Sequence, residues 1–142
     1  MMDASETATL TVPAKREAFA ALSAWLEARL APLNPSPKAR RQLLVAADEI
    51  LTNVASYAYP PGAPGELQVT LRHADGTLSL TFADRGVPYD PLTAPPPDLS
   101  RPLAERAPGG LGLFIVRKTM DAVDYRRDGD RNVLTLTKRL TP

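Results

Sequence analysis

The sequence of 142 residues predicts an α+β domain, a two-layer α/β sandwich with helices on one face of a mixed, mostly antiparallel sheet. Apolar residues recur at helical spacing in some segments and with a period of two in others, where turn signals flank them. The segments follow the order β-α-α-β-β-loop-α-β-β, without an internal repeat or linker. This order favours helices packed on one side of a sheet that both ends of the chain share, so residues 1–142 are expected to form a single domain.

The N-terminal elements are an edge strand and two helices. Residues 7–15 alternate until a proline ends the strand. Residues 14–30 have the apolar spacing of an amphipathic helix. Three prolines then interrupt the chain, and Ser36 before Pro37 has the form of an N-cap followed by a first-turn proline. A second helix therefore begins there, and we expect it to end before Pro60.

Two hairpins and a helix are expected in the C-terminal half. Residues 66–73 and 76–84 alternate around Asp75-Gly76, which is a strong hairpin signal. Helical spacing returns in residues 109–123, and residues 121–139 close the chain as a second hairpin.

A long loop separates the first hairpin from the last helix. Seven of the fifteen prolines lie between Pro88 and Pro108, which excludes regular structure there. A loop of this length inside a compact domain is usually functional or disordered.

Composition removes several functional classes. The net charge is +1, so electrostatics alone gives no reason to expect binding to nucleic acid or to a membrane surface. The chain has no cysteine, which excludes thiolate chemistry and is compatible with a reducing cytosol. A single histidine, His73, argues against His-clustered metal sites and Ser-His catalysis. No signal-peptide pattern or long apolar run indicates secretion or a membrane span.

The second helix carries a polar pair in the apolar stretch DEILTNVASYAY. Glu49 and Asn53 are four residues apart, so they lie on one helical face. An ionised glutamate is seldom fully buried without a partner. The pair therefore marks either a solvated helix edge or the wall of a site, and the apolar neighbours weigh against the solvated edge.

Two further motifs each have a functional and a structural interpretation. In FADRGVPYDP, Asp84 at a strand end can accept a hydrogen bond from an exocyclic amine, and Gly86 lets a flat ring approach the backbone. A simple turn favours the same residues. In GGLGLFIV, glycines that open a helix leave backbone N–H groups free to hold phosphate, although a flexible helix start would also explain them. The spacing matches neither a P-loop nor a dinucleotide fingerprint.

The order of these three motifs resembles that of the GHKL ATPase superfamily, whose nucleotide-binding fold is the Bergerat fold. Within it, DEILTNVASYAY, DRGVPYDP and GGLGLFIVRKTMDAVDY are similar to the three boxes of the anti-sigma-factor serine/threonine kinases, and GDRNVLTLTKRL resembles their closing hairpin. Pro88 stands where many superfamily members have a second glycine, but this form is familiar in the anti-sigma branch. No helix with a phospho-accepting histidine precedes the domain, which disfavours a histidine kinase.

The resemblance implies a role for each motif residue. Glu49 would be the general base, and Asn53 would coordinate the Mg²⁺ that bridges the phosphates of ATP. Asp84 would accept a hydrogen bond from the adenine amino group, and Gly86 would make room for the ring. Residues 89–108 would form a lid over the nucleotide. The backbone that wraps the phosphates would come from Gly109, Gly110, Leu111, Gly112 and Leu113. The resemblance leaves open which cation neutralises the transferring phosphate. Arg101, Arg106 and Lys118 are candidates, although a solvated charge would also explain each of them.

The implied function is that of an ATP-dependent protein serine/threonine kinase in the cytoplasm. It would phosphorylate a small anti-sigma-factor antagonist, bind a sigma factor and form a homodimer, without direct contact to nucleic acid or membrane. Two alternatives stay open: a catalytically weak, ATP-gated protein-binding regulator, and ATP hydrolysis in which the same glutamate activates water. The presence of Glu49 favours the kinase, since a pure binder needs no base.

Overall fold

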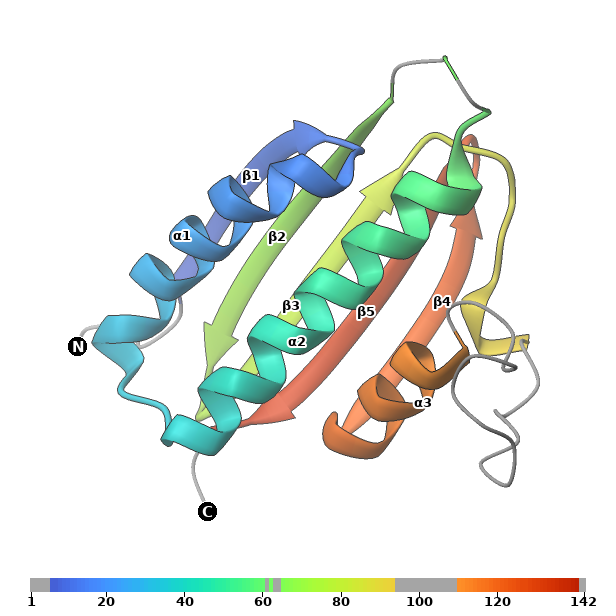
Figure 1. The fold of residues 1–142 in the computed structure, drawn as a ribbon. Coiled ribbons are helices and arrows are strands. Elements are labelled where there is room, and N and C mark those ends of the chain that lie inside the picture. Colours follow the sequence, from blue (N-terminus) through green and yellow to red (C-terminus); the bar gives the residue numbers. More distant parts are fainter. Residues whose placement is uncertain (1–5, 61, 63–64, 94–109, 141–142) are drawn as a thin grey trace.

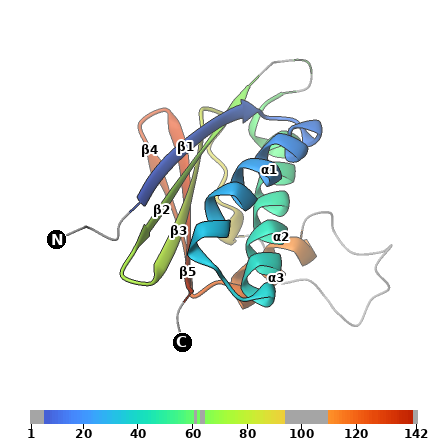
Figure 2. The ribbon, with the colours of Figure 1, turned by 90° about the vertical axis from the view of Figure 1, so that its left-hand side faces the viewer.

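The computed structural model describes residues 6–60, 62, 65–93 and 110–140, which form two layers (Figure 1). One layer is a five-stranded sheet in the order β1-β2-β3-β5-β4. In the other layer, the α-helices of the described residues all lie on one face of that sheet (Figures 1 and 2). The strands are β1 (Glu6–Pro13), β2 (Glu66–Ala74), β3 (Thr77–Asp84), β4 (Ala122–Asp128) and β5 (Arg131–Arg139). The helices are α1 (Phe19–Leu30), α2 (Pro37–Asn53) and α3 (Gly110–Thr119). The predicted α+β architecture is confirmed, and every strand pair is antiparallel.

The hydrophobic core lies between the sheet and the helices. Alternate residues of each strand point into it, because successive side chains of a strand project to opposite faces. The buried members from β2 and β3 are Leu67, Val69, Leu71, Leu78, Leu80 and Phe82. The other strand residues face away from the helices and are mainly polar, so the sheet has one apolar face and one polar face.

Local sequence signals explain the hairpins. The β2–β3 hairpin turns at Asp75 and Gly76, whose φ angles of 54° and 76° both lie in the left-handed region. Such angles define the two-residue turn that Asp-Gly favours, so the predicted hairpin is confirmed. The β4–β5 hairpin turns at Gly129, where φ is 61°.

Helix α2 begins as the sequence predicts. The side chain of Ser36 accepts a hydrogen bond from the backbone N–H of Ala39 at 3.1 Å, and Pro37 occupies the first turn. The helix ends at Asn53 and continues as a single π-helical turn, Val54–Ala58, before the chain turns to β2. Wider turns of this kind are frequent at functional sites.

The boundaries of the other two helices differ from the prediction. The first helix was expected from residue 14, but Ala14 still donates to the backbone of Gly65 at 2.9 Å. A short 3₁₀ turn, Arg16–Ala18, then precedes α1. Helix α3 ends at Thr119, whose carbonyl accepts a hydrogen bond from Lys138 at 2.7 Å. None of the helices in the described residues is long and apolar enough to cross a membrane.

Candidate functional site

Two of the expected site residues line one cavity between the sheet and the helices. Asn53 ends α2 and Asp84 ends β3, and each residue is only 6% exposed. The other residues that line the cavity are Ile50, Val54, Ala58, Phe82, Tyr89, Pro91, Tyr125, Asn132 and Leu134. The cavity is therefore mostly apolar, and the side chains of Asn53, Asp84 and Asn132 are the buried polar groups that converge on it.

Asp84 is held by hydrogen bonds on one of its carboxylate oxygens. Its Oδ1 accepts from the backbone N–H of Gly86 at 2.8 Å and from Nδ2 of Asn132 at 2.9 Å. Its other oxygen has no protein partner among the described residues. The carboxylate is thus fixed in orientation, with one acceptor left for a ligand.

Asn132, near the start of β5, was not predicted as a site residue. Besides binding Asp84, its Nδ2 donates to the carbonyl of Val87 at 2.9 Å. Its Oδ1 accepts from the hydroxyl of Tyr125 at 2.6 Å and from the backbone N–H of Tyr89 at 3.2 Å. The available signal was an asparagine at a strand position in phase with Leu134 and Leu136, which point into the core. A buried amide with this many partners ties β5 to the segment that follows β3.

Position 86 requires a glycine because the chain crosses close to another backbone segment there. A Cβ at this position would collide with the backbone carbonyl of Ala58, in the π turn after α2. The next residue, Val87, donates its backbone N–H to that same carbonyl at 2.8 Å. This close crossing explains the glycine without a ligand, and its expected role in making room for a ring stays a prediction.

Glu49 lies one turn before Asn53 on α2 and faces the start of α3. A Cβ on Gly112 would collide with the carboxylate of Glu49, so α2 and α3 are in close contact at this point. The two helices are thus brought together at the expected residues. A larger residue at position 112 would displace the carboxylate, which explains the glycine there.

The environment of Glu49 favours its neutral form. Partial burial raises the pKa of this carboxyl above its ordinary value, and the nearby negative charge of Asp48 raises it further. The positive charge of Arg16 acts on the pKa in the opposite direction. A carboxyl with a raised pKa is a better proton acceptor when it is ionised, which suits a general base.

Asn53 has a polar atom without a protein partner. Its Nδ2 is buried and makes no hydrogen bond within the described residues. Leaving a buried donor unpaired costs about 1–3 kcal/mol. A carboxamide that the fold does not use is suited to a ligand with polar groups of its own, and rotation of the amide can present its oxygen instead. Hydrated Mg²⁺ on phosphate is such a ligand and requires few protein oxygens. The side chain of Asn53 therefore fits the expected metal-bound phosphate.

The expected phosphate loop is described only from Gly110, where α3 begins. Gly109 lies outside the described residues. Leu111 and Gly112 belong to the first turn of α3, and the side chain of Leu113 is buried. The start of a helix presents free backbone N–H groups, so this segment can bind an anion.

The expected lid is described only at its beginning. Tyr89 is half-buried, and its ring lies against Tyr57 with centroids 5.5 Å apart. Pro91 is buried, whereas residues 94–108 with Arg101 and Arg106 lie outside the described residues. The third candidate cation, Lys118, is in the last turn of α3, where its Nζ lies 5.5 Å from the ring centroid of Phe114.

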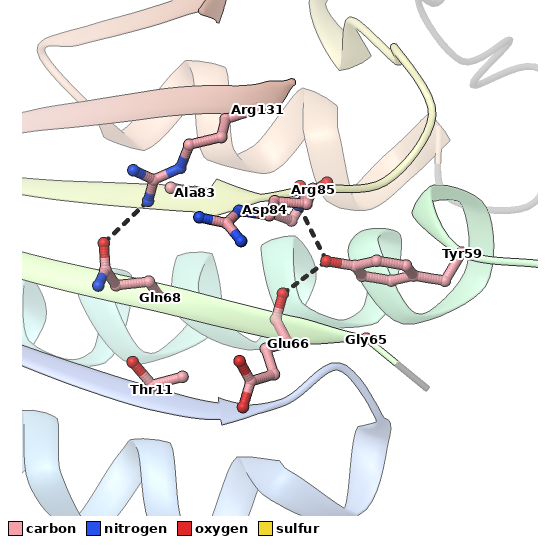
Figure 3. Close-up of a pocket in the computed structure, with 9 residues that line it drawn as sticks. All are labelled: Thr11, Tyr59, Gly65, Glu66, Gln68, Ala83, Asp84, Arg85 and Arg131. Atoms are coloured by element: carbon pink, nitrogen blue, oxygen red, sulfur yellow. Dashed lines mark hydrogen bonds between the residues drawn. The ribbon is translucent and has the colours of Figure 1, made fainter. Parts of the chain in front are cut away.

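A wider cavity of about 580 Å³ lies on the helix-free face of the sheet (Figure 3). Tyr59 closes one end of it, since its hydroxyl donates to the carbonyl of Glu66 at 2.8 Å and accepts from the backbone N–H of Arg85 at 2.9 Å. At the other end, Arg131 donates to Gln68 at 2.9 Å. Asp84 lines both cavities and Glu49 lines neither. Asn53 lines only the smaller cavity between the layers, which is therefore the candidate site.

The fold and the placement of Asn53, Asp84 and Glu49 agree with the class of protein that a family comparison gives. Residues 12–138 match the family model described as histidine kinase-like ATPase domain. The chain therefore belongs to the histidine kinase-like ATPase domain family, and the resemblance given by the three motifs is confirmed.

Particular relatives lie within this class. The chain is 41% identical over 118 residues to the serine/threonine-protein kinase BtrW of Bordetella bronchiseptica, with 83% of each chain covered. It is 29% identical over 139 residues to the serine-protein kinase RsbW of Halalkalibacterium halodurans, with 95% of this chain and 84% of that protein covered.

Solved structures show the same fold. The RsbU and RsbW domains of a Mycobacterium tuberculosis protein match 96% of this chain with a TM-score of 0.69 and 19% identity. This chain spans 33% of that longer one. The histidine kinase domain of a blue-light-activated kinase from Erythrobacter litoralis matches with a TM-score of 0.55 and 15% identity, covering 91% of this chain and 62% of that one.

Proposed function

We propose that this chain is an ATP- and Mg²⁺-dependent protein serine/threonine kinase whose substrate is a small anti-sigma-factor antagonist. We further propose that residues 1–142 act as one domain, that the protein binds a sigma factor, and that it works as a homodimer in the cytoplasm without direct contact to nucleic acid or membrane. Family membership and the kinase names of the relatives support this proposal. The observation that carries it is the placement of Glu49 and Asn53 on one face of α2, where Asn53 shares a cavity with Asp84 and Glu49 meets the start of α3.

Asp84 would select the purine. Its free carboxylate oxygen can accept a hydrogen bond from the amino group of adenine, whereas guanine has a carbonyl at the corresponding position and would be repelled. The cavity beside Asp84 has a volume of about 30 Å³, which has room for water but not for a purine. A purine could therefore enter only if residues that line the cavity moved outward.

Phosphoryl transfer would use Glu49 as the base. A serine or threonine hydroxyl of the antagonist attacks the γ-phosphorus, forming an O–P bond as the bond to the β–γ bridging oxygen breaks and ADP leaves. The hydroxyl proton passes to Glu49. Mg²⁺, held by Asn53 and the phosphates, would neutralise charge on the leaving group. The backbone N–H groups from Gly110 to Gly112 would bind the phosphate oxygens.

The test removes the base and keeps its shape. Glu49→Gln should bind Mg-ATP with nearly unchanged affinity in calorimetry, but should transfer labelled phosphate to the cognate antagonist at least about a hundredfold more slowly. Asp48→Asn is the matched control, because Asp48 is the neighbouring exposed carboxylate of the same helix. This control should retain transfer.

Two outcomes would contradict the proposal. Undiminished transfer by Glu49→Gln would remove Glu49 from the reaction. A wild-type chain that binds Mg-ATP and captures its antagonist, but never transfers phosphate, would support the ATP-gated regulator instead.

A further inference from the structure

The wider cavity on the helix-free face of the sheet is not used by the proposed kinase chemistry (Figure 3). Its volume of about 580 Å³ lies within the range of small-molecule sites, which commonly measure about 300–1,000 Å³. One of its lining residues is Ala83, which lies between Gln68 on β2 and Val133 on β5 in the strand register. A small side chain at this central position leaves space above the sheet.

Three charged side chains line this cavity near one end of the sheet. Arg131 begins β5, Arg85 follows β3, and Glu66 begins β2. Tyr59 holds the backbones of Glu66 and Arg85 side by side, because its hydroxyl is hydrogen-bonded to both. Figure 3 shows the guanidinium groups of Arg85 and Arg131 over the sheet, with the carboxylate of Glu66 on the side nearer β1. Two positive charges and one negative charge therefore border the same space.

These charges do not neutralise one another. Within the described residues, Glu66 makes no salt bridge with either arginine, and Arg131 has no carboxylate partner. Arg131 is half-buried and donates to the neutral side-chain oxygen of Gln68 at 2.9 Å. Arg85 lies 3.8 Å from Asp130, but both side chains are 74% exposed, so this pair contributes little. Both guanidinium groups therefore have donors left for a ligand.

We propose that this cavity binds a small acidic amino acid such as glutamate. Each of its two carboxylates would accept paired N–H groups from one arginine, since guanidinium and carboxylate match in a bidentate geometry. Its ammonium group would lie beside Glu66. Two carboxylates and one ammonium complement two guanidinium groups and one carboxylate, whereas a phosphate has no cationic part for Glu66. This inference rests on no part of the kinase proposal.

The cavity lies behind the purine end of the candidate site. Arg85 follows Asp84 and Arg131 precedes Asn132, and consecutive residues of a strand project to opposite faces. Asp84 and Asn132 are paired in the strand register, and their side chains are hydrogen-bonded at 2.9 Å. The carboxylate of Asp84 therefore does not compete for the arginines. A ligand held by both arginines would join the ends of β3 and β5.

Calorimetry with glutamate tests the site. The wild-type chain should bind glutamate with a dissociation constant of about 1 mM or lower, and binding should persist in excess Mg-ADP. Arg131→Gln should weaken binding at least about tenfold, because a charge-assisted pair is lost. Arg85→Gln should do the same, and its exposed side chain separates a loss of binding from a loss of the fold.

Arg126→Gln is the matched control. Arg126 belongs to the same hairpin as Arg131, but it lies beside Asp128 and outside the cavity. Its substitution removes the same charge from the protein, so it should leave the affinity for glutamate within about twofold of the wild type.

Glu66 tests the class of ligand. Glutarate has the two carboxylates of glutamate without the ammonium group, so the wild-type chain should bind it more weakly than glutamate. Glu66→Gln should reduce this preference, because the variant lacks the carboxylate that the ammonium would meet. Inorganic phosphate, the third probe, should also bind more weakly than glutamate.

Several results would overturn the inference. An absence of binding at millimolar glutamate would remove the site. Displacement of glutamate by Mg-ADP would place it in the nucleotide site instead. Equal affinity for glutamate, glutarate and phosphate, or a preference that survives Glu66→Gln, would overturn the assignment to an acidic amino acid. None of these results bears on Glu49 or on phosphate transfer, so the kinase proposal is tested separately.

Discussion

The two ends of the candidate site differ in how far the protein satisfies its own polar groups. At the end next to the sheet, Asp84 and Asn132 are bound to each other and to the backbone of Gly86 and Val87. At the end on α2, Asn53 has a buried nitrogen without a partner among the described residues, and the pKa of Glu49 is raised by burial.

The difference indicates which end belongs to the fold and which is reserved for a ligand. A satisfied network of buried hydrogen bonds fixes one arrangement of the chain. An unpaired buried group lowers stability, and such costs tend to occur at functional sites. The purine end would thus be built before any ligand arrives, whereas the phosphate end would be completed by one.

The largest expected effect is on the fold at the purine end. Gly86→Ala would force a methyl group into the carbonyl of Ala58, which belongs to backbone and cannot rotate away. We expect a loss of about 3 kcal/mol in the free energy of unfolding, measured by urea denaturation. Gly129→Ala is the control, because open space surrounds that residue and only its φ of 61° is unfavourable. It should cost about 1 kcal/mol. Equal losses would show that the crossing at Ala58 is not tight.

The comparison is most direct for the two buried asparagines. Asn132→Ala removes hydrogen bonds from Asp84 and from the carbonyl of Val87, and should cost about 2 kcal/mol of stability. Asn53→Ala removes no bond from its nitrogen, and should change stability by less than about 1 kcal/mol while Mg²⁺-dependent ATP binding in calorimetry is lost. If Asn53→Ala were the more destabilising of the two, the two ends of the site would not differ as described.

A smaller effect is expected at the purine contact itself. Asp84→Asn keeps the shape and one acceptor oxygen for Gly86, but it replaces the charged oxygen that would meet adenine. A hydrogen bond to a charged group contributes about 1.5–3 kcal/mol, so ATP affinity should fall about tenfold or more. The affinity for inorganic triphosphate should stay unchanged. Equal weakening of both ligands would mean that Asp84 serves only the fold.

The sequence revealed those parts of the fold and the site that depend on near neighbours. Ser36 before Pro37, and Asp75 before Gly76, determine their structures through contacts within a few residues. The spacing of Glu49 and Asn53 likewise gives a shared helical face without knowledge of the fold.

The missed features depend on contacts between distant segments. Asn132 is a hub only because β5 lies beside β3, which brings it to Asp84, and no spacing rule connects the two. The contact of Gly112 with Glu49 requires the packing of α3 on α2. The late start of α1 has a similar cause, since the backbone of Ala14 bonds to that of Gly65 before the helix begins.

The smallest effect concerns the charges around the base, and it tests whether the phosphate end is tuned through Glu49. The proposed mechanism requires Glu49 in its ionised form, so the rate should fall as pH falls through the pKa of that carboxyl. Because burial raises this pKa, the acidic limb of the profile should lie above the ordinary range of glutamate. Single-turnover transfer measured across pH gives its position.

Two charge-neutralising variants should move this limb in opposite directions. Asp48→Asn removes a negative charge and lowers the pKa of Glu49, so activity should persist to lower pH. Arg16→Gln removes a positive charge and raises that pKa. As the pH is lowered, this variant should therefore lose activity at a higher pH than the wild type does. Each shift should be less than about one pH unit, and high salt should reduce both, because it screens exposed charges. The part of the rise in the pKa of Glu49 that burial causes should persist in high salt. Profiles that coincide for both variants would mean that another group limits transfer at low pH.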